Sequence, residues 1–230
     1  MGSFETGTCK FMCPKKTGHI NLHVPKRRFV IASGPTEEPI DPVRFISNRS
    51  TGTMGRCLAQ AARRKGYAVI WIQCPKDART ALDLKKKLQV LVPQSDCFIM
   101  AAAVCDARPV FFAKRKIKKA KLRNIQLVKN PDILAGLPKK KGQVFIGFGI
   151  ESGDIFENGF KKLVQKKLDR IVLQKVTARR DPFGDKRIDA LVMDKDKRCA
   201  HFRSATKARI AGYLIQEAER LLRISRKFGG

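Results

Sequence analysis

The sequence has few acidic residues, few aromatic residues that can form hydrogen bonds, and no long apolar run. Only 20 of its 230 residues are Asp or Glu, against 49 Lys or Arg, which gives a formal net charge of +29. No segment reaches the roughly 18 apolar residues of a membrane span, and the N-terminus lacks the apolar core of a signal peptide. These absences predict a cytoplasmic protein that does not enter a membrane.

Two common nucleotide-binding motifs are also missing. No G-x-x-x-x-G-K-[ST] sequence is present, which excludes a Walker A phosphate loop. The first strand-to-helix turn lacks G-x-G-x-x-G, and the second expected strand ends at Gln73 and Cys74 without an acidic residue. Both absences argue against a dinucleotide cofactor, because its pyrophosphate needs those glycines and its ribose needs that acid.

The basic surplus makes nucleic-acid binding a competing hypothesis, since such a charge attracts polyanions. However, the chain has one Trp and two Tyr, and it lacks an aromatic cluster of the kind found in RNA-binding sheets. The basic residues are also spread along the whole chain. We therefore interpret the surplus as a solvated surface that helps to gather phosphate-bearing substrates, with nucleic acid as the second choice.

The first residues are expected to form a tail. Residues 1–27 are predicted to be a flexible basic segment, followed by a single domain over 28–225. Cys9, Cys13, His19 and His23 could in principle bind zinc, but the interval between the two pairs is about half of that in a zinc finger. The seven cysteines show no disulfide-scaffold spacing and are expected to be free thiols.

Apolar strands and amphipathic helices alternate along the rest of the chain. This alternation predicts an α/β fold with a Rossmann-like, doubly wound, mostly parallel sheet that has helices on both faces. A small C-terminal β element is expected from residues 190–193 paired with 200–202. The expected strands are 28–32, 67–73, 97–104, 144–151 and 169–174, and the expected helices are 50–66, 81–91, 155–167 and 206–223.

The connection between the first strand and the first helix is about 18 residues long, and a loop of that length in a compact domain is usually functional. It offers Arg44 and Arg49 for anions and Asn48 as a directed donor and acceptor. A Ser50-Thr51-Gly52 turn then aims the first helical amides toward a phosphate. We therefore expect a binding site in this loop.

The stretch from Ile31 to Gly55, IASGPTEEPIDPVRFISNRSTGTMG, closely resembles the opening motif of the phosphopantothenate–cysteine ligase (phosphopantothenoylcysteine synthetase) family. That motif reads approximately ITAGPTREPIDPVRFISNRSSGKMG. Glu37 stands where Arg is common, and Thr53 replaces the motif lysine. A pattern of this length is far more specific than a single glycine-rich turn.

Further segments resemble the same family. Residues 101–109 are similar to AAAVADYRP, with Ala107 in place of tyrosine, and residues 116–119 match KIKK. Residues 130–134 match NPDIL and are expected to form a turn that opens a helix. Residues 144–151 are similar to VGFAAET, while Gln174 replaces the usual Asn.

The resemblance implies a free-standing bacterial ligase, because the tail is too short for the flavin-dependent decarboxylase that is often fused to this enzyme. Such a ligase joins 4'-phosphopantothenate to L-cysteine through an acyl-cytidylate made from CTP, with release of pyrophosphate, in coenzyme A biosynthesis. The implied cofactor is Mg²⁺, bound with the triphosphate, and the implied assembly is a homodimer built with the help of the C-terminal region. The alternative is a catalytically weakened member that binds nucleic acid or nucleotides.

The resemblance also implies the roles of individual residues. The catalytic residues are Asn48, Lys116, Arg44 and Ala103. The residues expected to bind the nucleotide are Met100, Ala101, Ala102, Asp106, Lys116, Pro131, Asp132, Ile133, Leu134, Phe148, Lys162 and Lys166. The residues expected to bind phosphopantothenate are Gly34, Arg44, Asn48, Ser50 and Gly52.

Some of these roles have support from the residues themselves. Asp106 follows a buried strand at its carboxyl end, where α/β folds bind ligands, although a loop-capping Asp is the simpler alternative. Lys162 and Lys166 are helical i,i+4 neighbours whose ammonium groups repel unless an anion lies between them, which favours a triphosphate over a solvated lysine face. For Lys116 the support is the resemblance alone, since it falls ten residues after Asp106 as the family pattern requires.

Overall fold

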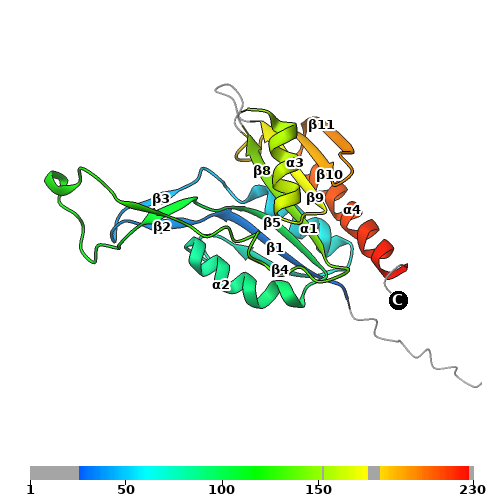
Figure 1. Ribbon diagram of the computed structural model, residues 1–230, viewed down its shortest axis with the longest axis horizontal. Coiled ribbons are helices and arrows are strands. Elements are labelled where there is room, and N and C mark those ends of the chain that lie inside the picture. The colour runs from blue at the N-terminus through cyan, green and yellow to red at the C-terminus, as the bar shows by residue number, and fades with distance from the viewer. Residues whose placement is uncertain (1–25, 152, 176–181, 228–230) are drawn as a thin grey trace, which may run out of the picture.

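The computed structural model describes residues 26–151, 153–175 and 182–227 (Figure 1). Nearly all of the tail predicted over residues 1–27, including its four potential zinc ligands, therefore lies outside the described residues. In the described part of the chain, no helix is both long and apolar enough to cross a membrane.

A seven-stranded sheet forms the centre of the fold. Five neighbouring strands of this sheet are parallel, and two more strands at one edge pair in the antiparallel direction. This arrangement confirms the predicted mostly parallel sheet, and the C-terminal pair continues it. The order is β4 (Ala68–Gln73), β1 (Arg28–Pro35), β5 (Cys97–Ala103), β8 (Val144–Glu151), β9 (Arg170–Lys175), β10 (Ile188–Asp194) and β11 (Cys199–Ala205).

Two helices cover each face of the sheet, as the doubly wound pattern predicts. On one face, α1 (Thr53–Arg64) and α4 (Lys207–Lys227) bury Leu58, Ile210 and Leu214 against the strands. On the other face, α2 (Ala81–Leu91) and α3 (Ile155–Gln165) bury Leu84, Leu88 and Leu163. The near-continuous apolar strands are consistent with a sheet that is buried on both sides.

Helix α1 lies unusually close to the first strand. A Cβ atom at Gly55 would lie 2.0 Å from the Cβ of Ser33, so only glycine allows this approach. The N-cap residue of α1, Gly52, has φ of +71°, a left-handed conformation that favours glycine. These two glycines bring the first turn of α1 against the carboxyl end of β1.

Four short strands that the sequence did not predict form an arm, defined here as residues 37–47 and 107–129. Strands β2 (Glu37–Pro39) and β3 (Phe45–Ser47) pair as one hairpin, and β6 (Ala107–Pro109) and β7 (Leu127–Lys129) pair as another. Strand β2 lies against β6, and the arm projects well beyond the sheet (Figure 1). The long connection after β1 is thus a hairpin in part. The remaining elements are the short 3-10 helices η1 (Val92–Gln94) and η2 (Lys119–Lys121).

The helix predicted to open at residues 130–134 does not form. The segment makes a single turn, in which the Asp132 carboxylate accepts a hydrogen bond from the Ala135 amide at 3.1 Å. Gly136 and Pro138 follow within the next turn, and both residue types disfavour continuation of a helix. The other helix and strand predictions are confirmed, with ends shifted by a few residues.

Candidate functional site

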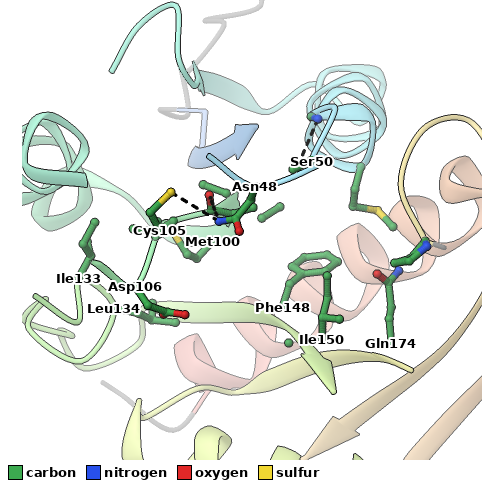
Figure 2. Close-up of a pocket in the computed structure, with 18 of the residues that line it drawn as sticks. Asn48, Ser50, Met100, Cys105, Asp106, Ile133, Leu134, Phe148, Ile150 and Gln174 are labelled. Carbon is green, nitrogen blue, oxygen red and sulfur yellow. Dashed lines mark hydrogen bonds between the residues drawn. The ribbon is translucent and has the colours of Figure 1, made fainter. Parts of the chain in front are cut away.

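A cleft of about 470 Å³ lies at the carboxyl ends of the parallel strands (Figure 2). Its walls come from the loop before α1, the ends of β5, β8 and β9, and the turn at residues 129–134. Strands β4 and β5 lie on opposite sides of β1, so the strand order reverses at β1. Open α/β sheets bind ligands at the carboxyl ends of the strands beside such a reversal, which is where the cleft lies. Figure 2 shows Asp106, Ile133 and Leu134 at one end of the cleft, Gln174 at the other, and Phe148 between them.

The first turn of α1 forms one wall. Ser50, Gly52 and Thr53 line the cleft, and the first turn of the helix contains no acidic residue. The hydroxyl groups of Thr51 and Thr53 are 2.9 Å apart, which gives this wall polar atoms beside the helix amides. A helix N-terminus with free amides and nearby hydroxyl groups suits a phosphate or carboxylate.

Asn48 lies where the arm joins the cleft. Its side-chain Nδ2 donates to the carbonyl of Ala103 at 3.0 Å and lies 3.9 Å from Sγ of Cys105. The buried Cys105 thiol also contacts the carbonyl of Thr36 at 3.6 Å, and burial raises its pKa. Cys105 therefore stays a neutral thiol at neutral pH, and it helps to fix the Asn48 amide against the end of β5.

Asn130 holds together the turn at the opposite wall. It is buried, and its Nδ2 donates to the Cys105 carbonyl at 2.9 Å while its Oδ1 accepts from Arg108 at 2.9 Å. Its backbone N–H also donates to the Asp106 carbonyl at 2.8 Å. These bonds place Ile133 and Leu134 beside Met100, and they form an apolar end of the cleft next to the exposed carboxylate of Asp106.

Lys162 and Lys166 both line the cleft, and each already has a carboxylate partner. The Lys162 ammonium donates to Glu151 at 2.5 Å, and the Lys166 ammonium lies 3.1 Å from Asp132. The mutual repulsion predicted from their spacing is therefore offset by two side chains, without a ligand. Burial raises the pKa of Asp132, but hydrogen bonds from Ala135 and Lys166 outweigh it and leave the pKa below its usual value.

The far end of the cleft contains residues that sequence reasoning did not select. Gln174 is only 8% exposed and lines the cleft beside Phe183. The buried Lys207 donates to the carbonyls of Pro182 at 2.8 Å and Gly184 at 2.5 Å, so it holds this segment over α1. Lys207 stands at the start of a predicted helix, and nothing in its local sequence separated it from many other lysines.

Three predicted site residues do not line the cleft. Gly34 is buried behind Gly52, and a Cβ at Gly34 would lie 2.2 Å from the Cys74 carbonyl, so close backbone packing explains this glycine. Arg44 and Lys116 lie in the arm instead. The cleft brings together all the other predicted residues, namely Asn48, Ser50, Gly52, Met100, Ala101, Ala102, Ala103, Asp106, Pro131, Asp132, Ile133, Leu134, Phe148, Lys162 and Lys166.

A dedicated metal cage is not found in the described ranges, which contain no group of three or more His, Cys, Asp or Glu residues placed to bind one ion. The cleft does offer the exposed carboxylates of Asp106 and Asp132. Mg²⁺ usually keeps several water ligands and is held by one or two carboxylates together with substrate phosphates. The donor set of the cleft therefore fits a magnesium ion that is bound with a triphosphate.

Several solved structures have a similar fold. The C-terminal domain of coenzyme A biosynthesis bifunctional protein CoaBC superposes with a TM-score of 0.70 and 29% identity, over 86% of this chain and 96% of that domain. A Cab2 mutant in complex with phosphopantothenate-cysteine superposes with a TM-score of 0.61, over 87% of this chain and 89% of that protein. Its 16% identity shows a shared fold alone.

Curated relatives are similar in sequence. CoaBC from Escherichia coli strain K12 is 38% identical over 176 residues, which cover 69% of this chain and 42% of that protein. A cysteine/cysteine sulfinic acid decarboxylase from an unknown prokaryotic organism is 36% identical over 206 residues, which cover 83% of this chain and 57% of that protein. The chain thus spans about half the length of these relatives.

Residues 24–222 match the family model of the DNA/pantothenate metabolism flavoprotein C-terminal domain. This match covers every wall of the cleft and the whole arm. It agrees with the motif resemblance found in the sequence. The chain therefore belongs to the family of the DNA/pantothenate metabolism flavoprotein C-terminal domain.

Proposed function

We propose that the protein is a ligase that joins 4'-phosphopantothenate to L-cysteine at the expense of CTP, in coenzyme A biosynthesis. The observation that carries the proposal is the meeting of four separate segments in one cleft. Asn48, Asp106, Phe148 and Lys162 are far apart in the sequence and all line the same 470 Å³ space. The names of the related CoaBC proteins support the same pathway.

The reaction needs an activated acyl group, because a carboxylate is a poor acyl donor. The carboxylate oxygen of phosphopantothenate attacks the α-phosphorus of CTP, forms an acyl–oxygen–phosphorus linkage and expels pyrophosphate. The amine of cysteine then attacks the acyl carbon, loses a proton and expels CMP, which leaves an amide. Most of the catalysis is positioning and charge stabilisation, as in other phosphoryl transfers.

The cleft offers suitable groups for the nucleotide at one end. Phe148, in the middle of the cleft, provides an aromatic face for the base, and the apolar pair Ile133 and Leu134 closes the end beside it. Asp106, Lys162 and Lys166 all line the cleft, and in this proposal Asp106 accepts hydrogen bonds from the ribose or the base while the two lysines neutralise phosphates. Mg²⁺, when bound with the triphosphate, supplies further neutralisation of charge on the phosphate oxygens.

The acyl substrate then takes the other part of the cleft. Gly52 and Thr53 at the start of α1 line the cleft together with Asn48, and they are the groups that we assign to the acyl substrate. In this proposal the acyl group and the α-phosphate meet beside the Ala103 carbonyl, which accepts from Asn48. In this arrangement Asn48 orients the acyl oxygens during both steps.

Lys116 fits this scheme in a homodimer. It lies on the arm and does not line the cleft of its own chain, and in our proposal it reaches the triphosphate because the arm enters the cleft of a second copy. The arm also exposes large apolar side chains, including Phe111 at 67% and Phe112 at 51%. Exposed apolar surface of this kind is typical of an interaction site, and a second copy would cover it.

Pyrophosphate release tests the proposal. The purified protein is mixed with phosphopantothenate, cysteine, Mg²⁺ and each nucleoside triphosphate in turn. We expect pyrophosphate release to require phosphopantothenate and to be fastest with CTP, and the amide product to require cysteine as well. Absence of release with every triphosphate would contradict the proposal.

Nucleic-acid binding is the second candidate, and one observation favours it. Residues 107–131, which form much of the arm, contain many Lys and Arg residues and no Asp or Glu. Tight RNA binding that weakens steeply with salt, together with absence of pyrophosphate release, would make this candidate the better account.

A further inference from the structure

The arm contains a buried carboxylate to which the proposed function gives no role. Asp41 lies in the turn between β2 and β3 and is only 2% exposed, although the arm itself projects into solvent. A buried carboxylate is costly unless hydrogen bonds and an opposite charge satisfy it. The hydrogen-bond partners of Asp41 therefore show which segments of the arm this carboxylate holds in place.

One oxygen of Asp41 shapes its own turn. Oδ1 accepts from the backbone N–H groups of Val43 at 2.9 Å and Arg44 at 3.0 Å. Two further bonds, from the Ile40 and Asp41 amides to the Arg44 carbonyl, close the same turn. Within the hairpin, Oδ1 is thus the carboxylate oxygen that accepts from the backbone of the turn.

The other oxygen reaches across to the basic segment. Oδ2 accepts from Nε and Nη2 of Arg44 and also from the backbone N–H of Ile117, at 3.2 Å. The Nη2 group of Arg44 in turn donates to the Ile117 carbonyl at 2.8 Å. Both backbone groups of Ile117 are therefore held by one ion pair, and the Ala113 amide adds a bond to the Ile40 carbonyl at 3.0 Å.

The family resemblance selected two cations, Arg44 and Lys116, that do not line the cleft of the same chain. Both are connected to Asp41. Arg44 is a direct partner of Asp41, and Lys116 precedes the clamped Ile117. Hydrogen bonding to Arg44 keeps the pKa of Asp41 well below its usual value, so the carboxylate remains charged at neutral pH. We propose that Asp41 is a positioning residue that holds Arg44 and the Lys116 segment as one preorganised cationic unit, which acts on the anionic substrates.

The inference rests on the proposed function, in which Lys116 acts on the triphosphate. Removal of the charge in Asp41→Asn places an amide beside the Arg44 guanidinium and frees the backbone of Ile117. A misplacement of about 1 Å at a catalytic group can cost on the order of a hundredfold in rate, so we expect pyrophosphate release to slow by about ten- to hundredfold. Asp77→Asn is the matched control, because its carboxylate accepts from the Gln73 amide at 2.8 Å, a bond within its own loop rather than to the Lys116 segment.

Two measurements on the full chain test the inference. The first is hydrogen exchange of the Ile117 amide, which should speed up in Asp41→Asn and stay unchanged in Asp77→Asn. The second is the rate of pyrophosphate release for Asp41→Asn, Lys116→Ala and the double variant. Because Asp41 acts through Lys116, the double variant should lose less activity than the product of the two single losses.

Unchanged exchange at Ile117, or a double variant whose loss equals that product, would overturn the inference. The exchange measurement needs no substrate, so it reads out the clamp even if the wild-type protein releases no pyrophosphate. A wild-type protein that releases no pyrophosphate would contradict the proposed function. The exchange measurement would then decide by itself whether Asp41 holds the Lys116 segment.

Discussion

In the cleft, the side chains that we assign to the site are held by a sheet that is buried on both faces, whereas in the arm they are held by hydrogen bonds around one carboxylate. Asn48 is fixed by a bond to the carbonyl of the last residue of β5, and Asn130 by a bond to the Cys105 carbonyl just after that strand. Arg44 and the Lys116 segment are held by Asp41 instead, outside both apolar core clusters. A site can thus combine a rigid pocket with cations on a projecting element, and the two parts should respond differently to substitution.

The largest expected effect separates two lysines of the arm. Lys116→Ala should slow pyrophosphate release by about two to three orders of magnitude, the scale of losing one preorganised stabilising group. Lys114→Ala removes the same charge two residues away, where an exposed cation is screened over about 10 Å. Equal losses for the two variants, measured at one ionic strength, would mean that the arm is only a basic surface.

A similar substitution probes the cleft. The double change Lys162→Ala with Lys166→Ala should slow pyrophosphate release by about a hundredfold, because two charge-assisted contacts to phosphates are lost. Lys161→Ala with Lys167→Ala is the matched control, since these exposed neighbours on and just after α3 do not line the cleft. A comparable loss in the control would show that net charge rather than position matters.

The third prediction concerns the rigidity of the cleft wall. Gly55→Ala places a Cβ against Ser33 and should lower the free energy of unfolding by about 1–3 kcal/mol, the usual cost of overpacking. Gly212→Ala, in the open environment of α4, should raise it by about 0.5–1 kcal/mol. Urea denaturation of both variants measures the difference. A neutral Gly55→Ala would mean that α1 can move away from β1 without cost.

The smallest expected effect is electrostatic and lies at the edge of the cleft. Lys166→Met should raise the pKa of Asp132 toward its usual value, as followed by NMR of the carboxyl carbon. Because the folded-state pKa is depressed, the stabilisation from this group is present above the unfolded-state pKa and disappears as pH falls through the folded-state pKa. An unchanged pKa would assign the shift to the Ala135 amide.

The sequence predicted the sheet and its helices because buried parallel strands and amphipathic helices leave clear periodic patterns. It did not predict the arm, whose strands are three residues long and whose pairing depends on contacts between distant segments. The turn at 130–134 was mistaken for a helix start, since Asn-Pro-Asp resembles a helix cap and the later Gly136 and Pro138 were given no weight.

The cleft was predicted well where long motifs define it and poorly where single residues do. Gln174 was noticed only as a departure from a motif, and Lys207 was indistinguishable from other basic residues until its contacts with Pro182 and Gly184 were known. Asp41 was part of a recognised motif, but its role depends on Ile117, which lies 76 residues further along the chain. Such long-range hydrogen bonds leave no local pattern in one sequence.

A mixing experiment tests most directly whether the cleft of one chain works with the arm of another. Lys116→Ala has an intact cleft, and the Lys162→Ala, Lys166→Ala double variant has an intact arm, so each alone should be nearly inactive. After the two proteins are unfolded together and refolded in equal amounts, random pairing should restore about a quarter of the wild-type rate of pyrophosphate release, because half of the dimers contain one complete site. A mixture no more active than its components would contradict the account and would place Lys116 either outside the reaction or in the site of its own chain.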